Sequence, residues 1–130
     1  MSMSDPIADL LTRMRNAKEA QHRYVDVFMN SMNVEILKVL VDKGFIEAFL
    51  PNDTERKVRV FLKYSEGRKP LIQGLKRISR PSLRRYVSYK KIPILFKGLG
   101  VAILSTPQGV CDGETARKMR VGGELLCYIW

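Results

Sequence analysis

The chain has 130 residues, 45% of them hydrophobic and 28% charged, which excludes a disordered chain and suits one ordinary domain or two small lobes. Its formal net charge of +10 is concentrated, because residues 56–97 hold 14 Lys or Arg and the single acid Glu66, while the remainder holds 9 basic and 12 acidic residues. Lysines that served only solubility would be scattered among acids, and the concentration argues against that explanation. It favours a polyanionic partner, with nucleic acid ahead of acidic membranes or acidic proteins.

The first predicted element is an amphipathic helix at the amino end. Ser4 or Asp5 can cap it, and Pro6 is tolerated in its first turn. Its apolar residues follow helical spacing: Ile7, Leu10, Leu11, Met14 and Ala17. Its polar side carries Thr12, Arg13, Arg15 and Asn16, and spacing alone indicates no more than a solvated helix face for them.

A short strand over Tyr24–Phe28 and a second helix are predicted next. We expect Ser31 or Asn33 to cap this helix and Gly44 to end it in a left-handed conformation, with Phe45 folded back onto the last turn. The residues predicted to face inward are Ile36, Leu37, Leu40 and Val41.

Two runs around a turn predict a β-hairpin. Residues 45–50 and Lys57–Leu62 flank the turn residues Pro51, Asn52 and Asp53. In the second run Val58, Val60 and Leu62 alternate with Lys57, Arg59 and Phe61, which predicts a basic outer face. The amino-terminal lobe, residues 1–66, is therefore predicted to be an α/β sandwich of helix, strand, helix, strand and strand, with two helices covering a small sheet.

The carboxyl-terminal lobe, residues 67–130, is predicted to begin within a turn-forming run at residues 65–70. We expect strands over 71–78, 83–87 and 101–104, and a turn or single helical turn from Pro93 to near Gly98. This lobe is mostly antiparallel sheet with one short helix. The whole chain is thus predicted to be an α+β protein of two small lobes.

A hydroxyl-rich turn opens the last 26 residues. Ser105 and Thr106 end an apolar strand, and Gly109 lets the chain turn tightly after them. Small hydroxyl groups at a strand terminus can meet a ligand at close range. The alternative is a polar turn that only reverses the chain.

A short helix is predicted after this turn. Asp112 can accept hydrogen bonds from the N–H groups of the first helical turn, and Ala116 and Met119 provide a spaced apolar face. Gly122 and Gly123 are expected to stop the helix.

Glu124 opens the final strand, which runs to Trp130. An antiparallel return of this strand would bring the Glu124 carboxylate beside Ser105 and Thr106. We therefore expect Glu124 to orient a hydroxyl group at this turn.

Basic residues bracket two tyrosines in the middle of the second lobe. The basic residues are Arg77, Arg80, Arg84, Arg85, Lys90 and Lys91, and the tyrosines are Tyr86 and Tyr89. Arginine and lysine hold phosphates and fix the register, whereas an aromatic ring stacks on an unpaired base. The pattern therefore predicts binding to structured RNA. Ordinary sheet packing is the alternative for either tyrosine, and it is stronger for Tyr89.

No pattern indicates catalysis, a metal or a cofactor. Cys111, Cys127 and His22 have neither zinc nor disulfide spacing, and GLGVAI lacks the third glycine of a dinucleotide fingerprint. An RNA-cleaving enzyme is the alternative class, and it would need a His or Lys pair at one phosphate. No apolar run approaches the ~18 residues of a membrane span and no leader pattern is present, so we expect a cytosolic protein with no membrane or small-molecule partner.

Motifs along nearly the whole chain resemble one family. The segments SDPIADLLTRMRNA, RISRPSLRRYVSYKKIP and GLGVAILST, then STPQGV, ARK, VGGE and LLCYIW, are similar to the family of small-subunit ribosomal protein eight. The resemblance implies a structural constituent of the small ribosomal subunit that binds the central domain of its rRNA and holds its shape during assembly. It also implies neighbouring small-subunit proteins as partners and, in some bacteria, repression of the protein's own operon mRNA.

The resemblance implies which residues lie near RNA. In the second lobe these are Arg80, Arg84, Tyr86, Lys90, Lys91, Ser105, Thr106, Gln108, Gly109, Gly122, Gly123 and Glu124, and in the first helix they are Thr12, Arg15 and Asn16. The second lobe is expected to make the main contact. A translational repressor that acts on mRNA outside the ribosome would share all of these features and is the alternative function.

The sequence departs from the family pattern at two places. Pro107 stands where many members have a third hydroxyl group, so a side-chain contact at that position does not carry over. Family members have a hydroxyl residue as the helix cap and an acid three residues later, and here Asp112 and Thr115 occupy these two positions. The exchange weakens the reciprocal capping box and leaves Asp112 as the cap.

Overall fold

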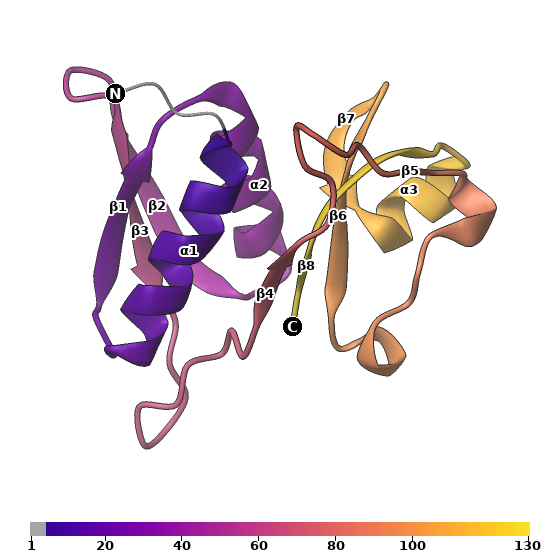
Figure 1. Ribbon diagram of the computed structural model, residues 1–130. Coiled ribbons are helices and arrows are strands. Elements are labelled where there is room, and N and C mark those ends of the chain that lie inside the picture. The colour runs from indigo at the N-terminus through magenta and orange to yellow at the C-terminus, as the bar shows by residue number, and fades with distance from the viewer. Residues whose placement is uncertain (1–4) are drawn as a thin grey trace. The chain divides into compact units, whose positions relative to one another are not determined.

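The computed structural model describes residues 5–130 (Figure 1). Helix α1, Pro6–Glu19, forms where the spacing of the apolar residues predicts it. The Asp5 carboxylate caps α1 by accepting the Ala8 N–H at 3.2 Å, whereas the other predicted cap, Ser4, lies outside the described residues. The predicted apolar residues are all buried: Ile7, Leu10, Leu11, Met14 and Ala17. The periodicity of the sequence therefore placed this helix and its inner face.

Helix α2, Ser31–Asp42, has a different cap from the one predicted. Asn30, not Ser31 or Asn33, caps it, because the Asn30 Oδ1 accepts the Asn33 N–H at 2.7 Å. The buried Asn33 side chain instead donates to the Phe28 carbonyl oxygen at 2.9 Å and ties the preceding strand to the helix.

The inner face and the end of α2 follow the prediction with one exception. Ile36, Leu37 and Leu40 are buried, but Val41 is exposed because it lies at the edge of the covered face. Gly44 has φ +79° and the Phe45 N–H returns to the Leu40 carbonyl oxygen at 2.9 Å, which is the predicted left-handed ending.

The amino-terminal sheet contains β1 (Tyr24–Phe28), β2 (Ile46–Asn52) and β3 (Lys57–Leu62) in the antiparallel order β1-β3-β2. Helices α1 and α2 lie against one face of it (Figure 1), and the inward residues of β3 are Val58, Val60 and Leu62. The hairpin turn comes later than predicted, since Pro51 and Asn52 belong to β2. Because β2 is an edge strand, Pro51 is tolerated there.

In the carboxyl-terminal sheet, β8 (Gly123–Ile129) is the strand to which most others pair. One side pairs with β6 (Val101–Thr106), which also pairs with β7 (Gly109–Asp112). The other side pairs with β5 (Tyr86–Val87) at the start of β8 and with β4 (Leu75–Arg77) at its end. All pairs are antiparallel, so the predicted α+β class is confirmed.

Two of the predicted strands are shorter than expected. The strand predicted over 71–78 is limited to Leu75–Arg77, and the one predicted over 83–87 is limited to Tyr86–Val87. Between them Pro81 lacks an N–H group, and Arg80 and Leu83 bond each other rather than β8. The intervening residues therefore form a loop.

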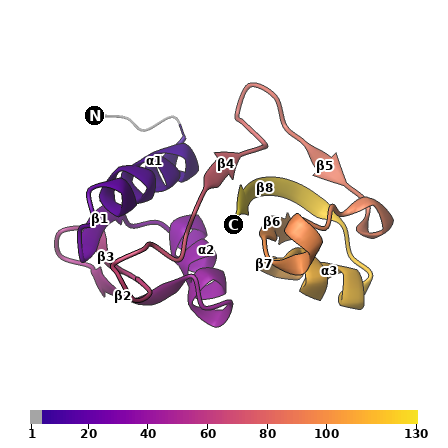
Figure 2. The ribbon, with the colours of Figure 1, turned by 90° about the horizontal axis from the view of Figure 1, so that it is seen from below.

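Helix α3, Gly113–Met119, covers β6 and β7 (Figure 2). The predicted cap is confirmed, because the Asp112 carboxylate accepts both the Thr115 N–H at 3.2 Å and the Thr115 hydroxyl at 2.6 Å. Ala116 is buried as predicted, but Met119 is exposed because α3 ends there. Arg120, with φ +57°, ends the helix in the left-handed conformation before the glycines are reached.

Two short 3-10 helices, η1 (Tyr89–Lys91) and η2 (Phe96–Gly98), join β5 to β6. The helical turn predicted near Gly98 corresponds to η2. Under α3 the core consists of Ile92, Ala102, Leu104, Ala116 and Leu125. Among residues 5–130, no helix combines the length and the apolar character that crossing a bilayer requires. The chain divides into two compact units, one ending at Gln73 and the other spanning Gly74–Trp130.

The two cysteines differ in burial, which predicts a difference in reactivity. Cys127 is fully buried on β8, and burial raises the pKa of its thiol to about 12, whereas Cys111 is half-buried with a pKa raised by burial and by Asp112. Since the thiolate is the reactive form, we expect iodoacetamide at pH 8 to modify Cys111 slowly and Cys127 only after denaturation. Mass spectrometry of the native protein would contradict this by showing two adducts formed at equal rates.

Candidate nucleic-acid interface

Three of the predicted site residues come together across β8 and its neighbours. In the antiparallel register Glu124 of β8 lies opposite Tyr86 of β5 on one side and opposite Ser105 of β6 on the other. Directly opposed residues share one face of a sheet. Residues adjacent to them in sequence pack in the core beneath α3: Val87, Leu104 and Leu125. The three residues, here called the Glu124 row, therefore lie on the sheet face opposite α3.

Glu124 orients a hydroxyl group, but not the one predicted. The hydroxyl of the fully buried Ser79 donates to the Glu124 Oε2 at 2.5 Å, and the Arg84 Nη1 donates to the same oxygen at 2.8 Å. The Ser79 Oγ also accepts the Arg85 N–H at 3.0 Å. These bonds fix the loop between β4 and β5 onto β8.

The prediction that Glu124 orients the hydroxyl of Ser105 or Thr106 is therefore wrong, because the hydroxyl that bonds Glu124 belongs to Ser79. The predicted antiparallel register, which places Glu124 beside Ser105, is confirmed. The Thr106 hydroxyl instead donates to the Gly109 carbonyl oxygen at 2.8 Å and accepts the Gln108 N–H at 3.1 Å. Thr106 is buried and holds the turn together, while Pro107, Gln108 and Gly109 are exposed at its tip. Thr106 thus acts on the shape of the turn.

The surroundings of Glu124 keep its carboxyl group ionised. Burial alone raises the pKa, but the hydrogen bonds from Ser79 and Arg84, together with the positive charges of Arg84 and Arg77, outweigh it and leave the pKa below its usual value. Glu124 is therefore a positioning residue, which holds Arg84 and the loop beside Tyr86.

Gly122 and Gly123 make room for neighbouring strands. A Cβ atom at Gly122 would overlap the Val87 carbonyl oxygen, and one at Gly123 would overlap the carbonyl oxygen of Ser105. These two glycines therefore allow β5 and β6 to approach β8 closely. Gly109 differs, because its φ of +112° is needed for the turn and open space surrounds its Cα.

The segment that carries Tyr86 of the Glu124 row is rich in cations and contains no acidic residue. Residues 74–97 contain eight Lys or Arg and no Asp or Glu. The exposed ones besides Arg84 are Lys76, Arg80, Arg85, Lys90, Lys91 and Lys97. Arg80 stands at the base of a tight loop, because its backbone exchanges two 3.0 Å hydrogen bonds with that of Leu83. Lys90 and Lys91 are presented on η1.

The two tyrosines have different environments. Tyr86 is 69% exposed, so its ring is accessible for stacking. Tyr89 packs against the core beneath α3 and has the Lys90 Nζ 5.9 Å from its ring centroid. Tyr89 is therefore mainly a packing residue, which is the alternative that the sequence weighed more heavily for Tyr89 than for Tyr86.

The remaining predicted residues lie in the other unit, on α1. Thr12, Arg15 and Asn16 are spaced three and four residues apart, so they share one side of the helix. Thr12 and Asn16 are exposed and Arg15 is half-exposed. They belong to the amino-terminal unit, whereas the Glu124 row belongs to the carboxyl-terminal one.

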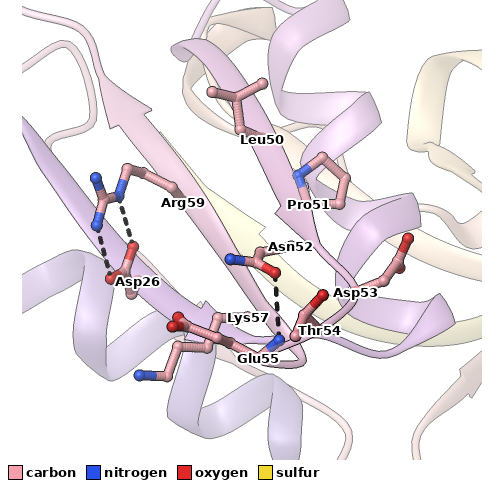
Figure 3. Close-up of a pocket in the computed structure, with 9 residues that line it drawn as sticks. All are labelled: Asp26, Leu50, Pro51, Asn52, Asp53, Thr54, Glu55, Lys57 and Arg59. Carbon is pink, nitrogen blue, oxygen red and sulfur yellow. Dashed lines mark hydrogen bonds and ion pairs between the residues drawn. The ribbon is translucent and has the colours of Figure 1, made fainter.

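The outer face of the amino-terminal sheet is not the basic surface predicted for the hairpin (Figure 3). Strand β1 brings Asp26 opposite Arg59, and the two form a doubly hydrogen-bonded ion pair at 3.0 and 3.2 Å. The hydrogen bond from Arg59 lowers the pKa of Asp26, despite some opposing burial, and so maintains the pair. An open hollow of about 530 Å³ here is lined by Asp53 and Glu55 as well as Lys57. Hairpin charges alone could not show this neutralisation.

Sequence reasoning missed Ser79 as a site residue. A serine just before Arg80 and Pro81 is typical of a turn, and only its position between β4 and β5 places its hydroxyl against Glu124. The assembled surface combines exposed guanidinium and ammonium groups, which can hold phosphates, with an exposed tyrosine ring, which can stack on an unpaired base. Fold and surface together define a basic α+β protein that exposes an aromatic ring beside a cation-rich segment.

Comparison with known proteins identifies the family. The profile of the family described as Ribosomal protein S8 matches residues 5–130. A small ribosomal subunit protein uS8 from Protochlamydia amoebophila is 50% identical over 133 aligned residues, covering all of both chains. Those from Chlamydia pneumoniae and Chlamydia trachomatis serovar D are 54% and 53% identical, covering 98% of this chain and 97% of each relative. The chain belongs to the ribosomal protein S8 family.

Proposed function

We propose that the chain is a structural constituent of the small ribosomal subunit, where it binds the central domain of the rRNA and stabilises its fold during assembly. Membership of the S8 family and the names of its relatives support the place of action. The observation that carries the binding is the Glu124 row, which sets an exposed aromatic ring among cations with no acid between residues 74 and 97.

The surface suggests a division of labour. Arg80, Lys90 and Lys91 supply sequence-independent contacts to phosphates, because their charged groups are exposed on a loop and on η1. Tyr86 and Ser105 supply contacts that depend on RNA shape, since bulges and distorted helices expose unpaired bases and 2′-hydroxyl groups. The amino-terminal lobe, residues 1–66, adds a supporting contact through Thr12, Arg15 and Asn16.

Tyr86→Ala should separate the two kinds of contact. Loss of one stacked base costs roughly 1–3 kcal/mol, so we expect roughly 5- to 150-fold weaker binding to a folded central-domain rRNA fragment and little change on a plain RNA duplex. Lys90→Ala should weaken binding to both RNAs and reduce the slope of log K against log salt by about 1. Binding titrations at several salt concentrations measure both quantities.

A matched control is available in the same unit. Lys118 is an exposed lysine on α3, where it pairs with Glu114 at 3.3 Å, and α3 covers the opposite sheet face from the Glu124 row. Lys118→Ala should therefore leave both affinities close to those of the unchanged chain. Equal losses from Tyr86→Ala on the fragment and on the duplex would contradict the proposed division.

Sedimentation tests the place of action. If the chain is a subunit constituent, most cellular copies should sediment with the small subunit in high magnesium. A mainly free pool would instead support the alternative of a translational repressor acting on mRNA.

A further inference from the structure

The loop between β4 and β5 carries a serine at its tip. Arg80 and Leu83 exchange backbone hydrogen bonds of 3.0 Å in both directions, so Pro81 and Ser82 form a two-residue turn. Every residue from 80 to 86 is exposed. The Ser82 hydroxyl makes no hydrogen bond to the described part of the chain, residues 5–130, and it is therefore accessible to an enzyme.

Arginines crowd around Ser82 without an acid to balance them. Arg77 and Arg80 lie five and two positions before it, Arg84 and Arg85 lie two and three positions after it, and residues 74–97 contain no Asp or Glu. Two peptide units separate Ser82 from Arg80 and from Arg84, so their Cα atoms lie within about 7.6 Å of its own. An anion attached to the Ser82 Oγ would therefore lie within reach of two guanidinium groups.

This surrounding suits a phosphate group far better than it suits a hydroxyl. A phosphoserine carries a charge of about −1.5 to −2 at pH 7 and three strong acceptor oxygens, and opposite an arginine cluster it forms new charge-assisted hydrogen bonds. The planar guanidinium group matches two phosphate oxygens at once. The turn is thus prepared to hold a phosphate that the unmodified chain lacks.

Arg84 connects the turn to the Glu124 row. Its Nη1 donates to the Glu124 Oε2 at 2.8 Å, and this ion pair helps to fix the loop beside Tyr86. The Arg84 side chain is 48% exposed, so it can turn away from Glu124 without unburying a charge. A phosphate with nearly two negative charges attracts it more strongly than one carboxylate does. A phosphate on Ser82 would therefore compete with Glu124 for Arg84.

Such a phosphate would oppose RNA binding in two ways. It would neutralise cations that otherwise hold RNA phosphates, and it would repel the RNA backbone itself. It would also release the loop that precedes Tyr86, because Arg84 would no longer tie that loop to β8. Both effects act on the same surface and both lower the affinity for RNA.

We infer that Ser82 is a phosphorylation site, whose phosphate takes Arg84 from Glu124 and so switches off the RNA-binding surface. This inference rests on the proposed function. Because the turn lies within the surface proposed to bind RNA, bound RNA shields Ser82 from an enzyme. The modification therefore takes place on the free chain and keeps that chain from binding.

The modifying enzyme is a protein kinase that uses a nucleoside triphosphate and has an acidic peptide groove, since arginines flank Ser82 on both sides. The Ser82 Oγ forms a bond to the γ phosphorus, and the bond between that phosphorus and the β–γ bridging oxygen breaks. The nucleoside diphosphate leaves with the electron pair of that bond, and the hydroxyl proton passes to a base of the kinase.

Phosphoserine placed at position 82 of the full chain by amber suppression tests the effect on RNA. Phosphoserine at position 31 is the matched control, because Ser31 is exposed at the start of α2 in the other unit, where a helix tolerates negative charge. Ser82→Ala removes the hydroxyl without adding charge. Circular dichroism checks that all three chains are folded.

We expect phosphoserine at 82 to weaken binding to the central-domain rRNA fragment by about tenfold or more and to reduce the slope of log K against log salt by about 2, because two cations are neutralised. Phosphoserine at 31 and Ser82→Ala should leave the affinity within about twofold of the unmodified chain. Equal losses from both phosphoserines would assign the effect to net charge and overturn the inference. An equal loss from Ser82→Ala would make the hydroxyl an RNA contact, which also overturns it.

Glu124→Gln tests whether Arg84 changes its partner. In the unmodified chain this substitution should weaken RNA binding, because the ion pair with Arg84 is lost. In the chain with phosphoserine at 82 the pair is already broken, so the same substitution should cause no further loss. Equal fold losses in the two chains would overturn the exchange of partners.

Mass spectrometry of the chain from growing and from starved cells tests whether the site is used. Trypsin does not cut between Arg80 and Pro81, so fragment ions must distinguish Ser82 from the buried Ser79 within one peptide. We expect phosphate on Ser82 in the free pool and not in small subunits. Phosphate on Ser79, equal phosphate in both pools, or none in either overturns the inference. Failure of the unmodified chain to bind the rRNA fragment would refute the proposed function instead.

Discussion

Gly123→Ala unfolds the carboxyl-terminal unit at temperatures where the unchanged chain is folded. The new methyl group would overlap the carbonyl oxygen of Ser105, so β8 and β6 would have to separate beside the Ser105–Glu124 pair. A clash with a backbone atom has little room to relax, and we expect a loss of about 3 kcal/mol, at the upper end for an overpacked interior. Thermal unfolding followed by circular dichroism should show the melting temperature lowered by more than about 10 °C.

Gly67→Ala is the matched control for this change. Gly67 has φ +78° but no neighbouring atom within 4 Å of the added methyl group, so the cost is backbone strain of about 1 kcal/mol. Equal shifts in melting temperature for the two variants would show that the overlap at Ser105 is relieved by movement of the strands.

Glu124→Gln weakens both folding and RNA binding. Ser79 and Arg84 donate to the same Glu124 oxygen, so the amide oxygen can still accept from both, but the neutral side chain no longer balances the charge of Arg84. The side chain of Glu124 is only 15% exposed, so we expect the free energy of unfolding to fall by roughly 1–3 kcal/mol. Affinity for the rRNA fragment should also fall, because the loop that precedes Tyr86 is released.

The dependence on pH identifies the charge as the cause. The folded pKa of Glu124 lies below its usual value of 4.5, so the stabilisation by the ionised group is complete above the unfolded pKa and is lost as the pH falls through the folded pKa. The difference in unfolding free energy between the unchanged chain and Glu124→Gln should therefore be constant near neutrality and shrink below about pH 4.5. A difference that is the same at pH 3 and pH 7 would contradict this explanation.

Glu114→Gln controls for loss of an acid as such. Glu114 is exposed on α3 and pairs with Lys118 at the surface, so its removal should change stability little at any pH. A comparable loss from Glu114→Gln would assign the effect to net charge.

The helices and the register of the final strand were accessible to sequence reasoning because their signals are local or follow from simple geometry. Apolar spacing located α1, and an antiparallel return from Ser105 placed Glu124 beside it. The resemblance to the S8 family, which spans most of the chain, is confirmed by the family profile.

What the sequence did not indicate depends on contacts between distant segments. The hydroxyl that bonds Glu124 belongs to Ser79, 45 positions away, and no spacing rule connects the two. Likewise, Asp26 neutralises Arg59 across 33 positions, so the hairpin appeared more basic than it is. The short lengths of β4 and β5 were also hidden, because the loop between them is fixed by β8 and not by its own residues.

The central position of β8 has a consequence for the timing of biosynthesis. When a nascent chain has emerged as far as Asp112, it already carries the cations of residues 56–97 but not the strand that aligns Tyr86 with Ser105. Under the proposed function, early electrostatic attraction to nucleic acid therefore precedes recognition of shape. We then expect discrimination between correct and incorrect RNA to begin only when translation has delivered Glu124, and unfinished chains to attach weakly and exchange freely.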